Sequence, residues 1–171
     1  MSEFLVSPIV SLYIGAFVQW GFLMAFLYSL AISINKSDKT AVWLSLVMSI
    51  SYSSSLFINI QHISYLQLFL FDITTIFAII ILRLFIIENL ISIYLLLGLI
   101  INSSLFLGMY IDVSVFNNYE PWWFWFFYSI VINLADFMML AIFFINKDFL
   151  ALATIKIWFH NSIMNRNNSS G

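Results

Sequence analysis

The sequence predicts an all-α, polytopic integral membrane protein with five transmembrane helices. Of its 171 residues, 63% are hydrophobic and only 8% are charged, whereas about a quarter of the residues in a soluble domain are charged. The apolar residues form stretches of roughly 20, the length that a helix needs to cross a hydrocarbon core about 30 Å thick. Soluble classes are therefore excluded. A nucleic-acid-binding surface is excluded too, because six lysines and arginines are spread along a chain of pI 5.4.

The few polar stretches of the chain separate the predicted spans. No charged residue lies between Glu3 and Lys36, which bounds the first span. The second and third spans are divided at the polar residues 59–64, because one helix over this whole region would be about 70 Å long, more than twice the hydrocarbon thickness. Pro121 opens the fifth span, where its missing N–H costs no hydrogen bond. The five spans are predicted at residues 8–34, 41–60, 65–87, 89–111 and 121–146.

The basic residues predict the orientation of these spans. In the five-span arrangement all six lie on one side of the membrane, and basic residues near spans stay in the cytoplasm. The N-terminus is therefore predicted outside and the C-terminus in the cytoplasm, with Glu3, Asp112 and Glu120 on the outer side. A four-span arrangement is the alternative, and it scatters the basic residues over both sides. The basic residues are Lys36, Lys39, Arg83, Lys147, Lys156 and Arg166.

The five-span bundle is predicted to cover residues 1–148. The chain after it is predicted to stay close to the membrane. Residues 149–165 contain no helix breaker, and Lys156 and His160 share one helix face, as in a helix that lies along the inner interface. An extension of the fifth span is the alternative. Residues 166–171 are predicted to be a disordered tail that resembles a linker left by an expression tag. No stretch outside the spans is long enough to form a soluble domain.

Three ionisable residues lie inside predicted spans: Asp72, Arg83 and Asp136. Such residues are costly in a membrane and need a partner, an aqueous cavity or a function. Counting at the helical rise, Arg83 lies about 27 Å and Asp136 about 21 Å below the outer boundary. A guanidinium spans this difference, so we predict a buried ion pair between Arg83 and Asp136.

A polar layer is predicted in the outer half of the membrane. Asp72 lies about 10 Å below the outer boundary, and Asn102 reaches a similar level on the next span. Such a layer either joins helices by hydrogen bonds, or lines an aqueous path, or forms a binding site. The other members of the predicted layer are Ser54, Ser55 and Ser103.

A stripe of small residues follows the first span at every fourth position: Gly21, Ala25, Ser29 and Ser33. Small residues at this spacing let two helix backbones approach closely in a membrane. The stripe is predicted to pack against another helix, either within the subunit or between copies.

The residue inventory argues against an enzyme and against a resident cofactor or metal. The chain has no cysteine, and its two histidines, His62 and His160, are predicted on opposite sides of the membrane, so they cannot share a haem or a zinc ion. There is also no metalloprotease, serine-hydrolase or phosphate-loop motif.

The sequence therefore predicts a non-enzymatic subunit of a bacterial-type inner membrane. We expect it to form homo-oligomers in the lipid bilayer and to anchor or signal to a cytosolic protein, as a membrane sensor in a stress or phage-defence system would. The alternative is a homo-oligomeric ion channel lined by the polar layer, with a small transporter as a third class. The predicted partner contacts are Lys36, Lys39, Lys156 and Arg166.

Overall fold

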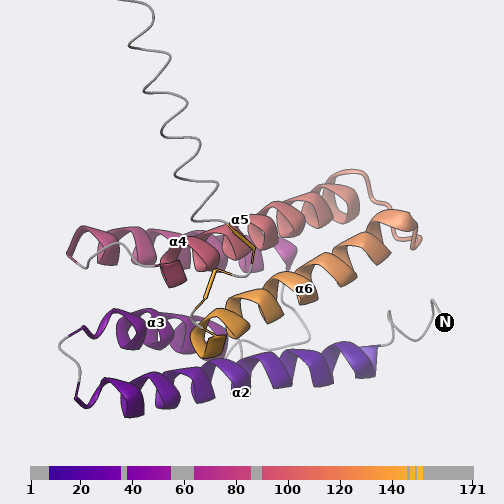
Figure 1. Ribbon diagram of the computed structural model, residues 1–171. Helices are drawn as coiled ribbons and strands as arrows, with labels where there is room; N and C mark the ends of the chain where they lie inside the picture. The colour runs from indigo at the N-terminus through magenta and orange to yellow at the C-terminus, as the bar shows by residue number, and fades with distance from the viewer. Residues whose placement is uncertain are drawn as a thin grey trace, which may run out of the picture.

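A computed structural model describes residues 8–35, 38–54, 64–85, 90–145, 147–148 and 150–151. Its elements are all helical over these residues, which confirms the predicted all-α class (Figure 1). They are α2 (Pro8–Ser33), α3 (Thr40–Ser54), α4 (Tyr65–Phe85), α5 (Leu90–Tyr110), the π-helical turn η3 (Ile111–Val115) and α6 (Trp123–Ile145).

Local sequence signals explain where several helices begin. Pro8 occupies the first position of α2, where proline needs no N–H partner. The Asp38 carboxylate accepts a hydrogen bond of 2.9 Å from the Thr40 N–H at the start of α3. At the start of α4, Ser64 and Gln67 form a reciprocal capping box: the Ser64 N–H donates to Gln67 Oε1 at 3.1 Å, and the Gln67 N–H donates to Ser64 Oγ at 3.3 Å.

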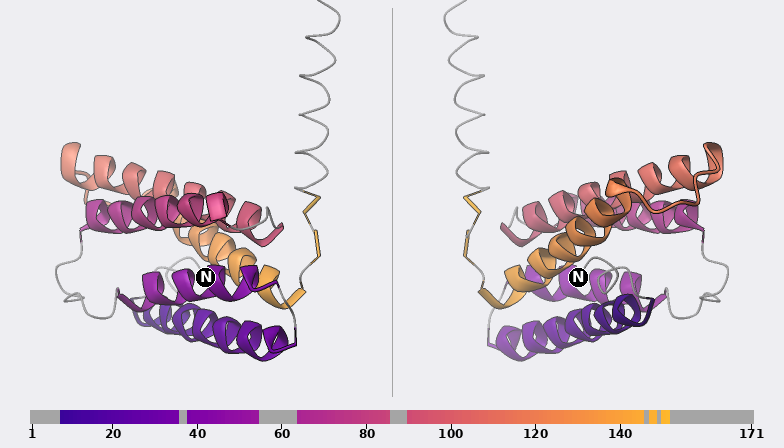
Figure 2. Two further views of the ribbon diagram at one scale, coloured as in Figure 1. Left: turned by 90° about the vertical axis from the view of Figure 1, so that its left-hand side faces the viewer. Right: turned by 90° about the vertical axis from the view of Figure 1, so that its right-hand side faces the viewer.

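The helices form two antiparallel pairs with α6 between them. Helices α2 and α3 pack as one pair, and α4 and α5 pack as the other. Helix α6 runs obliquely between the pairs and contacts α5 and α2, as Figures 1 and 2 show from three sides. Helix α5 therefore packs against both α4 and α6.

Four helical segments are long and apolar enough to cross a membrane: Tyr13–Ser33, Tyr65–Leu84, Leu90–Val115 and Trp123–Ile145. This supports the prediction of a multi-pass membrane protein. Helix α3 has 15 residues, or about 22 Å of length, which is less than a full crossing. The rest of the predicted second span, residues 55–60, lies outside the described residues, so the count of five spans remains a prediction.

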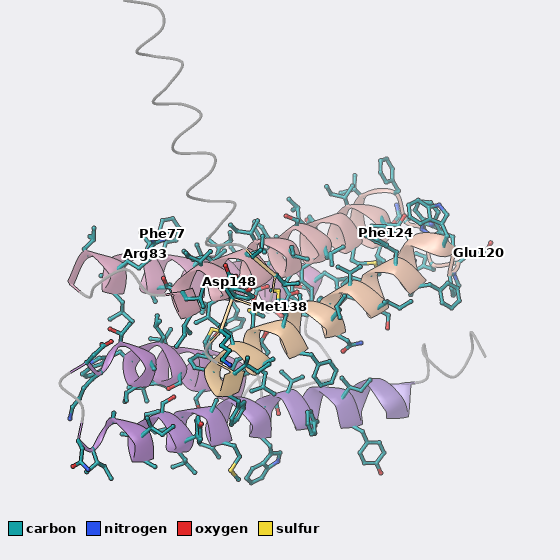
Figure 3. The ribbon with its side chains drawn as sticks, in the orientation of Figure 1. Phe77, Arg83, Glu120, Phe124, Met138 and Asp148 are labelled. Carbon is teal, nitrogen blue, oxygen red and sulfur yellow. The ribbon has the colours of Figure 1, made fainter. Side chains whose placement is uncertain are left out.

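Each long helix buries one face and exposes large apolar side chains on the other. Phe22, Leu99 and Met139 are fully buried in the core, whereas Phe77 and Leu134 are 61% and 66% exposed. Figure 3 shows Phe77 on the outside of the bundle. Apolar surface of this extent is rare on a soluble monomer and is what a lipid-facing surface requires.

The small-residue stripe of α2 packs inside the subunit. A Cβ placed on Gly21 would lie 2.5 Å from Leu140 Cδ2 of α6, so only glycine fits without a shift of that side chain. Ala25 is fully buried, and Ser29 and Ser33 are 6% and 7% exposed. Of the two predicted packing arrangements, within the subunit or between copies, the structure shows the contact within the subunit.

Glu120 and Arg83 lie at opposite ends of the bundle. Figure 3 shows Glu120, in the turn before α6, at the opposite end from Arg83, in the last turn of α4. This separation agrees with the predicted orientation, although the side that faces the cytoplasm stays a prediction. The predicted interfacial helix and tail, residues 149–165 and 166–171, lie outside the described residues apart from residues 150 and 151.

Candidate functional site

Asp136 is the centre of a hydrogen-bond network that joins three helices. The Tyr52 hydroxyl of α3 donates to Asp136 Oδ1 at 2.5 Å. The Asn102 amide of α5 donates through Nδ2 to the same oxygen at 2.7 Å. The Tyr52 ring packs against Phe22 of α2 with its centroid 4.5 Å away. The network therefore fixes α6 against α3 and α5 in the interior of the bundle.

Asp72 enters the same site from α4. It is 8% exposed and lines one cavity together with Asp136 and Asn102. Asp72 Oδ2 and Asn102 Oδ1 are buried, and neither has a hydrogen-bond partner in the described part of the chain. The cavity measures about 100 Å³. We call it the carboxylate cavity, and its lining residues are Ser51, Tyr52, Leu68, Phe71, Asp72, Asn102, Phe106 and Asp136.

Helix periodicity and a hydroxyl pair place these groups. Tyr94, Gly98 and Asn102 follow at intervals of four residues and share the buried face of α5. On the α3–α4 side, Ser51 Oγ and Thr75 Oγ1 lie 2.6 Å apart in a hydrogen bond. Thr75 is three residues from Asp72, so this pair holds the α4 carboxylate next to the end of α3.

The described lining of the carboxylate cavity carries negative charge without a cationic side chain. Two carboxylates line it, and among the residues that the structure describes no lysine, arginine or histidine does. Asp136 receives two hydrogen bonds, but both donors are neutral. A carboxylate buried without a compensating charge costs several kcal/mol or more. The site therefore offers negative charge and acceptor oxygens with which to hold a proton or another cation.

The structure does not bring Arg83 to Asp136, so the predicted ion pair is corrected here. Arg83 lies eleven residues beyond Asp72 on α4, a rise of about 16 Å, whereas Asp136 lies at the cavity of Asp72. The depth count assumed that Tyr65 and Trp122 are level. Asp136 is fourteen residues from Trp122, but Asp72 is only seven from Tyr65. The start of α6 is thus roughly 10 Å further from the cavity, along the helix, than the start of α4.

The predicted polar layer is divided between the cavity and helix backbones. Asp72 and Asn102 line the cavity. The Ser54 hydroxyl instead donates to the Ser51 carbonyl at 2.7 Å, and the Ser103 hydroxyl donates to the Ile100 carbonyl at 3.1 Å. Ser55 lies outside the described residues.

Hydrogen bonds to Asp112 hold the turn between α5 and α6. Trp122 Nε1 and Trp125 Nε1 donate to Asp112 Oδ2 at 2.9 and 3.0 Å. The Asn118 amide donates to Asp112 Oδ1 at 3.1 Å. All four partners are near one another in sequence, so this cluster stabilises the turn. It also lets α5 and α6 extend together beyond the start of α4 (Figure 1).

A second anchor lies on α5 at the other end of the bundle. The fully buried Tyr94 donates its hydroxyl to Asp148 Oδ1 at 2.6 Å, and the Leu150 N–H donates to the Tyr94 oxygen at 2.7 Å. These bonds attach the chain beyond α6 to α5, near which Figure 3 labels Asp148. The sequence analysis did not predict this contact. The only signal was a tyrosine within an apolar stretch, because a buried tyrosine hydroxyl usually finds a hydrogen-bond partner.

Only one of the predicted partner contacts lies within the described residues. Lys39 is exposed in the turn before α3. Lys36, Lys156 and Arg166 lie outside the described residues, so their proposed role rests on the sequence.

Comparisons with known proteins give no further assignment. No protein-family model, curated protein or solved structure matches the chain.

Proposed function

We propose that the protein is a non-enzymatic inner-membrane subunit that senses a cation or proton at the carboxylate cavity and signals to a cytosolic protein. The observation that supports this best is the pair of carboxylates, Asp72 and Asp136, at one cavity between the helices, with neutral hydrogen-bond donors. Binding of a positive charge there changes the balance of forces between α4 and α6, because both carry a carboxylate. The site therefore has the property that a sensor needs.

The contacts along α5 supply a route from the cavity to the cytoplasmic end. Asn102 bonds to Asp136. One turn away, a Cβ on Gly98 would lie 2.4 Å from Met139 Cγ, so α5 and α6 are in close contact there. A further turn away, Tyr94 holds Asp148. A small shift of α6 at the cavity therefore reaches the segment that precedes the predicted partner contacts.

Site-specific labelling tests this coupling directly. The chain has no cysteine, so Ala151→Cys introduces a single thiol just beyond the Tyr94 anchor. Its labelling rate in proteoliposomes, relative to that of a reference thiol at Asn117→Cys, should change between acidic and alkaline buffer. Asp136→Asn should abolish the change. An unchanged ratio in the parent chain would contradict the sensor proposal.

A conducting path is the second candidate function. A recess between α3 and α4 adjoins the carboxylate cavity at Ser51 and Phe71 and is also lined by Ser54, Thr74 and Thr75. Because Asp72 is buried inside the chain, such a path runs through each subunit and not through a ring of subunits. Purified protein should then carry ions into liposomes without a partner, and Asp72→Asn should alter that flux.

A further inference from the structure

We propose that the carboxylate cavity binds a small monovalent cation that carries N–H donors, namely ammonium or a short primary alkylammonium. This inference rests on the proposed cation site and names its ligand. Residues of four helices line the cavity, which offers unpartnered polar atoms, a compensating negative charge and aromatic side chains.

The unpartnered atoms of the cavity are both acceptors. Asn102 uses its amide nitrogen to bind Asp136, so the oxygen of the same amide is the group left free. Asp72 contributes the second free oxygen, Oδ2. Their residues are 2% and 8% exposed, so bulk water does not satisfy them. A ligand that completes the site must therefore donate hydrogen bonds to at least two oxygens at once.

The charge of the site indicates a monovalent cation. Asp136 already receives two hydrogen bonds, from Tyr52 and Asn102, which favour its ionised form. Asp72 Oδ2 receives none from the described residues. One positive charge beside Asp72 thus meets the carboxylate oxygen that has no donor, while Asp136 keeps its two neutral donors.

The size of the cavity limits the ligand. Its volume of about 100 Å³ equals the share of roughly three water molecules in liquid water. Ammonium or methylammonium fits this space, whereas a metal ion with its hydration shell does not. Calcium and magnesium take about six or more oxygen ligands, and no group of three acidic, histidine or cysteine residues suited to a metal occurs among the residues that the structure describes.

The walls of the cavity favour an organic or ammonium cation over a strongly hydrated one. Tyr52, Phe71 and Phe106 supply three aromatic rings, and the faces of such rings attract ammonium groups through their quadrupole. Phe106 also packs edge-to-face on Tyr128, with ring centroids 6.0 Å apart. Hydrogen-bond acceptors and aromatic rings around one cavity are a combination that suits an alkylammonium group.

Thermal unfolding of the purified full chain with different cations tests the inference. Chloride salts of ammonium, methylammonium, sodium, potassium and tetramethylammonium are compared at one pH and one ionic strength. We expect ammonium and methylammonium to raise the apparent Tm in a saturable manner. Tetramethylammonium, which has no N–H, should not. Equal effects of sodium, potassium and ammonium, or no cation effect at all, would overturn the proposal.

Variants locate the effect. Asp72→Asn should remove the ammonium response, and Glu120→Gln, which removes a carboxylate at the exposed outer end, should retain it. If Asp72→Asn fails to fold, Phe106→Leu provides a second variant that keeps the charge and should weaken the response. An ammonium response that survives in Asp72→Asn would refute the site. Loss of the ammonium effect with an intact pH response at Ala151→Cys would refute this inference and leave the proposed sensor function standing.

Discussion

Replacing Tyr52 by phenylalanine tests the network that organises the carboxylate cavity. The substitution keeps the ring that packs on Phe22 at 4.5 Å and removes the hydroxyl that donates to Asp136 Oδ1 at 2.5 Å. A hydrogen bond to a charged group contributes about 1.5–3 kcal/mol. For a chain of 171 residues, each kcal/mol corresponds to roughly 2–4 °C of Tm. We therefore expect Tyr52→Phe to lower the apparent Tm by about 3–12 °C.

A double-mutant cycle separates this bond from other effects of the substitution. In an Asp136→Asn background, Tyr52→Phe should cost clearly less, because the charged acceptor is gone. Arg83→Ala and Asp136→Asn should instead be additive, since the structure does not join them. The assay is thermal unfolding in one detergent, with Tyr119→Phe, at an exposed tyrosine, as the control. Additive losses for Tyr52 and Asp136, or a strong coupling of Arg83 with Asp136, would refute the reasoning.

Three further predictions use the same cysteine-free chain. Gly98→Ala should lower the Tm because its Cβ would meet buried Met139 atoms at 2.4 and 2.5 Å, an overpacking worth about 1–3 kcal/mol; Gly15→Ala, with open space around it, should not. Tyr94→Phe should speed limited proteolysis near Asp148, because two hydrogen bonds to the hydroxyl are lost. Single cysteines at 117 and 37 should be labelled only from outside and only from inside, respectively; labelling from one side would contradict the five-span topology.

The helices were predictable because each depends on local sequence. The third predicted span, 65–87, corresponds to α4 at Tyr65–Phe85. The fifth, 121–146, corresponds to α6 at Trp123–Ile145. Long apolar stretches bounded by polar residues specify such helices whatever their neighbours are. The second predicted span, 41–60, begins within one residue of α3 at Thr40, but its end lies outside the described residues.

The site was predictable only in part, because it depends on how the helices are staggered. Asp72 and Asn102 were assigned to one level by counting residues, and the structure places both at the carboxylate cavity. Asp136 was assigned to a deeper level. No local pattern reports that α5 and α6 extend beyond α4, since that offset depends on how α5 packs against both α4 and α6.

This stagger also decides the chemistry of the cavity. If the helices were level, Arg83 would approach Asp136 and neutralise it, and Asp72 would be the one uncompensated carboxylate of the bundle. With α6 offset outward, Asp136 lies beside Asp72, and its partners are the neutral Tyr52 and Asn102. Two carboxylates then line one cavity, and no cationic side chain of the described residues lines it with them. A proton or a bound cation is therefore the charge that we propose to complete the site. The packing of α4, α5 and α6 would then depend on what the cavity binds, as the proposed function requires.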